Sequence, residues 1–117
     1  TVRDQLDRQA ARIATNRVVA GVHFPVDSMA GQMLGVALGE YFAGRCVPNQ
    51  TMKSRTFKSS EFDQNFPALD FNPFSSVQDL DTGSFYGVGS TAWAIPSSPL
   101  LGAMWGQGRD EWAGKFP

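Results

Sequence analysis

The 117-residue chain has few of the residues that build disulfides and metal sites. It contains one cysteine, Cys46, and one histidine, His23. A single cysteine excludes an internal disulfide, and one cysteine with one histidine excludes a zinc site of four Cys and His ligands. No run of about 18 apolar residues occurs, so we expect no transmembrane segment in this chain.

The sequence also lacks an excess of charge of either sign. Ten Lys and Arg residues stand against eleven Asp and Glu residues, which gives a formal net charge of −1. Because no basic cluster stands out, we expect no nucleic-acid partner. Hydrophobic residues make up 42% and charged residues 18% of the chain, which indicates one soluble globular domain or part of one. The first residue is Thr1 and not methionine, which favours a fragment or a processed chain.

The first half of the chain has the pattern of two helices. Apolar side chains recur at steps of three and four from Val2 to Ile13, and charged residues fill much of the other face. Gly21 is expected to end this helix, since a helix end often needs a residue at positive φ. A second helix is expected from Pro25 to near Gly44, because proline is tolerated in a first helical turn.

The second half changes character at Val47. Residues 47–99 are rich in Ser, Thr, Asn, Asp, Gly and Pro, and the phenylalanines among them follow no stable period. We therefore predict a helix–turn–helix part over 1–46 and a long irregular tail over 47–117, pinned by aromatic side chains. A short last helix is expected from Leu100 to Trp112, and the three tryptophans are expected to anchor packing. The run from Asp81 to Ser84 matches the short aspartic-protease signature, but its polar flanks favour a turn.

One short segment carries a pattern with chemical meaning. Arg17 is followed after five residues by His23 and after three more by Asp27. His23 and Asp27 are four positions apart, so they share one face at a helix start. Asp27 can accept the Nδ1 proton of His23, which leaves the lone pair of Nε2 free. A turn at Gly21 can bring the guanidinium of Arg17 back to the imidazole, where it suits a tetrahedral oxyanion.

This pattern resembles the third signature of the superfamily of type-2 phosphatidic-acid phosphatases and vanadium haloperoxidases. That signature reads Ser-Arg, five residues, His, three residues, Asp, and small residues often follow it. The chain has Asn16 in place of the serine, then Arg17, His23 and Asp27, and later Ala30 and Gly31. The match covers roughly residues 13–42.

The resemblance implies a mainly α fold that forms part of the superfamily's helical-bundle core. It implies that Arg17 binds phosphate or vanadate, that His23 is the nucleophile or the vanadium ligand, and that Asp27 orients His23. The leading expectation is a phosphatase that hydrolyses phosphate esters through a phosphohistidine, with no cofactor. The alternative is a haloperoxidase that uses vanadate, peroxide and halide.

The family's other motifs are not found in this chain. The first motif has Lys and Arg-Pro, and the second, Pro-Ser-Gly-His, supplies the histidine that acts as general acid. We therefore expect an incomplete active site that needs a missing N-terminal portion of the same protein. A noncatalytic helical fragment or interaction piece is the hypothesis from another class. The resemblance favours a periplasmic or secreted protein.

Overall fold

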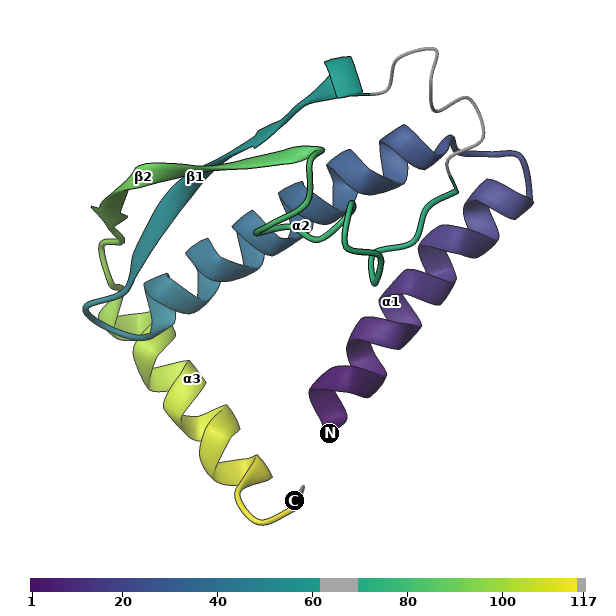
Figure 1. Ribbon diagram of the computed structural model, residues 1–117. Helices are drawn as coiled ribbons and strands as arrows, with labels where there is room; N and C mark the ends of the chain where they lie inside the picture. Colours follow the sequence, from purple (N-terminus) through teal and green to yellow (C-terminus); the bar gives the residue numbers. More distant parts are fainter. Residues whose placement is uncertain (62–69, 116–117) are drawn as a thin grey trace.

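The computed structural model describes residues 1–61 and 70–115 as three helices and a two-stranded antiparallel sheet. In chain order the elements are α1 (Val2–Val19), α2 (Pro25–Cys46), β1 (Thr51–Phe57), a short 3-10 helix (Ser59–Glu61), β2 (Tyr86–Ala94) and α3 (Pro99–Trp112). In Figure 1, α2 crosses the molecule beneath the sheet, and α1 and α3 run from its two ends toward each other in this view.

The two strands correct the predicted fold class. The described chain is a small mixed α/β structure and not part of a helical-bundle core, because 51–57 and 86–94 pair as a hairpin. The expectation of an irregular tail over 47–117 is therefore wrong. The ladder is irregular between Lys53 and Arg55, where two steps along β1 correspond to four along β2, since Lys53 pairs with Ala92 and Arg55 with Val88. This bulge breaks the alternation by which strands are recognised.

The turn between α1 and α2 follows from three local features. Gly21 has a φ of +74°, and the amide of Val22 donates to the carbonyl of Arg17 at 3.1 Å. Pro25 stands in the first turn of α2, and the Asp27 carboxylate accepts from the amide of Phe24 at 3.1 Å. These caps satisfy backbone groups that helix ends otherwise leave unpaired. The predicted helices and the helix stop at Gly21 are thus confirmed.

The hydrophobic core lies where α2 meets the start of β2. Its buried members are Met29, Phe71, Phe85 and Tyr86, with Met29 at 0% and Phe85 at 1% exposure. The Tyr86 hydroxyl donates to the carbonyl of Met29 at 3.2 Å. The core therefore joins residues from both halves of the sequence. The aromatic anchoring expected of this segment holds for Phe71 and Phe85, while Phe62 and Phe66 lie outside the described residues.

Helix α3 packs on the end of α2 and leaves much of its own surface open. The Trp105 ring lies edge-on to Phe42, with ring centroids 6.3 Å apart. Trp93, Trp105 and Trp112 are all more than 40% exposed, so they pack at the surface, and the predicted packing role is seen in the contact of Trp105 with Phe42. Within residues 1–61 and 70–115, no helix combines the length and the apolar character needed to cross a bilayer.

Tyr86 is expected to make stability depend on pH in the alkaline range. Burial raises its pKa from 10.0 to about 12. The folded state therefore holds this proton more tightly than the unfolded chain, so the stabilisation is complete below pH 10.0 and is lost as pH rises toward about 12. In urea titrations, Tyr86→Phe should lower stability by about 1 kcal/mol at neutral pH, through loss of one hydrogen bond. The gap to the parent should close at alkaline pH, and a gap that stays constant would contradict the assignment.

Candidate functional site

The turn at Gly21 brings Arg17 and His23 into direct contact. Nη2 of Arg17, in the last turn of α1, lies 2.7 Å from Nε2 of His23. Both side chains are accessible from the groove described below. The sequence predicted this meeting from the spacing of the two residues and the glycine between them, and the prediction is confirmed.

This contact fixes the protonation pattern of the imidazole. A guanidinium has N–H donors and no acceptor, so Nε2 of His23 must accept the hydrogen bond with its lone pair. The proton of the neutral ring is then on Nδ1. The lone pair that a nucleophile or a metal ligand needs is thus on the nitrogen that faces Arg17.

Asp27 is placed beside His23 but differs from the expectation in detail. Its Oδ2 atom lies 3.8 Å from Nδ1 of His23, which is close enough for charge attraction and too long for a hydrogen bond. The same oxygen accepts from the Phe24 amide at 3.1 Å. The carboxylate is therefore shared between capping α2 and facing the imidazole, where it can stabilise positive charge that develops on the ring.

These residues open into a groove between α1, α2 and the 70–81 segment, with a volume of about 890 Å³. Its walls are apolar near the middle, from Ile13, Val36 and Leu80. Gln32 of α2 also lines the groove, and its Oε1 atom is buried with no hydrogen-bond partner in the described part of the chain. A buried amide oxygen without a donor is costly, so Gln32 is an unsatisfied polar group in the wall of the groove.

A second arginine stands at the other end of the groove. Arg55 donates to Glu40 at 2.9 Å and to Asp81 at 2.8 Å, and its side chain is only 13% exposed. The hydrogen bond with Asp81 is the largest cause that raises the pKa of Arg55, and burial opposes it. Both carboxylates neutralise the guanidinium of Arg55, which thereby links β1 to α2 and to the 79–83 turn. Arg17 is the arginine that lies beside His23.

The carboxylates of the groove are not arranged as proton donors. Asp79 accepts from the Thr82 hydroxyl at 2.7 Å and from the amides of Asp81 and Thr82, and the hydroxyl is the largest cause that lowers its pKa. Glu40 and Asp81 are both paired with Arg55. A general acid must hold a proton near neutral pH. His23 itself is the only histidine in the sequence.

The Asp81–Ser84 run is a turn, as predicted. The Gly83 amide donates to the carbonyl of Asp79 at 2.8 Å. A Cβ on Gly83 would run into the backbone carbonyls of Val77 and Asp79. Only glycine fits this turn without a shift of the backbone, and Asp81 is thereby held where it binds Arg55.

Among residues 1–61 and 70–115, no group of three His, Cys, Asp or Glu side chains lies close enough to hold a metal ion. Vanadate does not need such a group. The resemblance to the vanadium haloperoxidases implies that one histidine nitrogen binds the vanadium and that hydrogen-bond donors hold the vanadate oxygens. Nε2 of His23 and the guanidinium of Arg17 fit a tetrahedral oxyanion of either phosphorus or vanadium.

Sequence reasoning missed Arg55 and Gln32. Arg55 lies 15 positions from Glu40 and 26 from Asp81 in the chain, so no local pattern marks their meeting. Gln32 stands in the small-residue stretch of α2, and nothing in its neighbours along the chain marks its Oε1 atom as buried without a partner.

No family model matches the chain, and no curated protein and no solved structure matches it at a significant level. The superfamily resemblance of residues 13–42 therefore stays a prediction. The function proposed next depends on the geometry of Arg17, His23 and Asp27 and on the chemistry that such an arrangement permits.

Proposed function

We propose that this chain is the C-terminal part of a phosphatase that hydrolyses phosphate esters through a phosphohistidine intermediate. The observation that carries the proposal is the 2.7 Å contact between Nη2 of Arg17 and Nε2 of His23. It places an anion-binding cation against the nitrogen that bears the lone pair. A phosphoryl group drawn to Arg17 arrives directly at the nucleophile.

The chemical step follows from these positions. The incoming phosphoryl oxygens replace Nε2 as the partner of the Arg17 N–H donors, which frees the lone pair. Nε2 attacks phosphorus, the P–N bond forms and the bond to the leaving group breaks. Positive charge then develops on the imidazole, whose Nδ1–H faces the Asp27 carboxylate 3.8 Å away. Arg17 stabilises the charge on the equatorial oxygens.

Protonation of an alkoxide leaving group requires a donor from outside this set of residues. Among the groove carboxylates, Glu40 and Asp81 pair with Arg55, Asp79 accepts from Thr82, Asp7 lies 3.8 Å from Arg3 and Asp27 caps α2. His23 is used as nucleophile. We propose that another portion of the same protein supplies the acid. Without that acid, we expect the 117-residue chain to accept a phosphoryl group on His23 only from donors whose leaving group needs no added proton.

The test uses phosphoramidate as phosphoryl donor with the 117-residue chain. The nitrogen of its zwitterion is already protonated, so ammonia leaves without a general acid. We expect one phosphohistidine, bonded at Nε2, visible by phosphorus NMR and by mass spectrometry of the His23 peptide. A product at Nδ1, or none at all, would overturn the proposal, and the Arg17–His23 contact would then be a structural link between α1 and α2.

Vanadate-dependent halide oxidation is the alternative use of the same residues. His23 would ligate vanadium through Nε2 and Arg17 would hold the vanadate oxygens. The full-length protein separates the two functions. A phosphatase should turn over p-nitrophenyl phosphate and be inhibited by vanadate, whereas a haloperoxidase should halogenate a dye with peroxide only when vanadate is added.

A further inference from the structure

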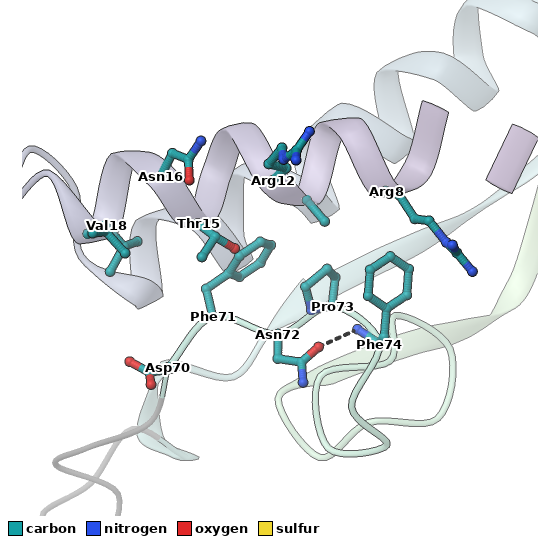
Figure 2. A pocket seen from close by; sticks show the side chains of 12 residues that line it. Arg8, Arg12, Thr15, Asn16, Val18, Asp70, Phe71, Asn72, Pro73 and Phe74 are labelled. Carbon is teal, nitrogen blue, oxygen red and sulfur yellow. Dashed lines mark hydrogen bonds between the residues drawn. The ribbon is translucent and has the colours of Figure 1, made fainter. Parts of the chain in front are cut away.

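A second cavity lies on a different side of α1 from His23, between this helix and residues 70–74. Its volume is about 590 Å³, which is within the range of small-molecule sites. Figure 2 shows Arg8, Arg12, Thr15 and Asn16 along the helix and Phe71, Asn72 and Phe74 facing them. Arg17 and His23 do not line this cavity.

Two cations in the cavity have no counter-charge of their own. Arg8 and Arg12 are one helical turn apart and therefore neighbours on the helix surface, where like charges repel. In the described part of the chain neither forms an ion pair, whereas Arg3 pairs with Asp7 and Arg109 with Asp110. Asp70 lines the cavity too, but Figure 2 places it at the end away from Arg8. An anion bound at these guanidiniums would supply the missing counter-charge.

The wall opposite the arginines is aromatic and held in place. Phe74 is 65% exposed although it lies beside a cavity. Its amide donates to Oδ1 of Asn72 at 3.1 Å, and the Asn72 amide donates to Oε1 of Gln78 at 2.8 Å. Gln78 is itself 1% exposed. The buried glutamine thus fixes the loop that presents the ring of Phe74, which Figure 2 shows at the same end of the cavity as Arg8.

We propose that this cavity binds a small aromatic phosphate or phosphonate, with the anionic group on Arg8 and Arg12 and the ring on Phe74. Guanidinium groups match phosphoryl oxygens through paired hydrogen bonds. An exposed aromatic ring offers a stacking face for the ring of a ligand. A carboxylate or free phosphate would satisfy the arginines and leave Phe74 uncovered, which is why the aromatic dianion fits better.

The site stands apart from the proposed phosphatase chemistry and shares walls with its groove. Phe71, Pro73 and Phe74 line both cavities, and Asn16 of this cavity precedes Arg17 of the other. A bound aromatic anion would therefore restrict the motion of residues 71–74, which line the His23 groove. This makes it a candidate effector site, and binding at it does not require His23 to be a nucleophile.

Phenylphosphonate is the probe, since it lacks an ester bond and cannot be hydrolysed. Its binding to the 117-residue chain would be followed by isothermal titration calorimetry and by amide shifts in NMR spectra. The double variant Arg8→Gln/Arg12→Gln should weaken binding by about tenfold or more, because each lost charge-assisted contact is worth about a factor of ten. Arg109→Gln/Lys115→Gln changes the net charge equally at exposed positions away from the cavity and should bind nearly as the parent does.

Two further measurements locate the ring and the anion. Phe74→Leu should weaken phenylphosphonate and leave methylphosphonate unchanged. In the Arg17→Gln variant, the amide shifts that phenylphosphonate causes around Arg8, Arg12 and Phe74 should persist, which separates this site from the His23 groove. Unchanged binding by the Arg8/Arg12 variant, an equal loss in the Arg109/Lys115 control, or shifts confined to residues around His23 would each overturn the proposal.

Discussion

Replacement of His23 by alanine is expected to abolish phosphorylation by phosphoramidate, and replacement of Arg17 by glutamine to slow it by a factor of about 10²–10³. The first variant removes the only imidazole of the sequence. The second keeps a hydrogen-bond donor but loses the charge that offsets the developing negative charge on the phosphoryl oxygens. The rate of appearance of the phosphohistidine signal measures both effects.

Graded variants separate chemistry from folding in this experiment. Arg17→Lys keeps the positive charge and loses the paired geometry, so its rate should lie between those of the parent and Arg17→Gln. Arg109→Gln removes an exposed arginine far from the groove and should react at the parental rate. Equal rates for Arg17→Gln and the parent would show that Arg17 has no part in the transfer, even if His23 is phosphorylated.

Phe85→Ala is expected to lower the free energy of unfolding by about 3–5 kcal/mol. The side chain is 1% exposed and belongs to the cluster that buries Met29 of α2. Its truncation leaves a cavity where the hairpin meets the helix. Since small domains have only about 5–15 kcal/mol in total, this loss is a large share. Urea denaturation followed by circular dichroism gives the value.

The matched control for Phe85 is a phenylalanine on the surface. Phe74 is 65% exposed, so Phe74→Ala removes the same atoms at a cost expected to stay below about 1 kcal/mol. If Phe85→Ala does not fold at all, Phe85→Leu gives a measurable intermediate loss. Similar losses for Phe85→Ala and Phe74→Ala would contradict the position assigned to the core.

The helices were predictable because their signals are local. Apolar steps of three and four mark α1, and Gly21 and Pro25 mark the turn within a few positions of where they act. The Arg17–His23 contact was also predictable from local signals, because it depends on the single turn between α1 and α2. Helix periodicity, a glycine at positive φ and a proline at a helix start are each properties of neighbouring residues.

The hairpin was missed because its signals are not local. Ser54 and Arg55 are both partly buried where extra residues of β2 bulge out of the ladder, so the inward positions of β1 do not alternate along the whole strand. The partner strand contains Gly87 and Gly89, which have low strand propensity. A side chain on Gly89 would meet the hydroxyl of Ser54, a reason for glycine that only the paired strands reveal.

The candidate site was predicted only in part for a related reason. Asp27 was expected to accept the Nδ1 proton of His23, but its Oδ2 caps the amide of Phe24 instead and lies 3.8 Å from the ring. A carboxylate at this helix position can do either, and the spacing in the sequence is the same for both. Which partner it takes is decided by the exact path of the turn.

The bond from the Tyr86 hydroxyl to the Met29 carbonyl has a consequence for the order of folding. The two residues are 57 positions apart, and Met29 shares its core cluster with Phe71, Phe85 and Tyr86. During synthesis, α1 and α2 emerge long before the residues that cover them. Contacts that span so much of the chain form late, because closing a long loop costs entropy before it is repaid. Any fragment that stops short of Phe85 therefore carries α2 with its core side chain exposed to water.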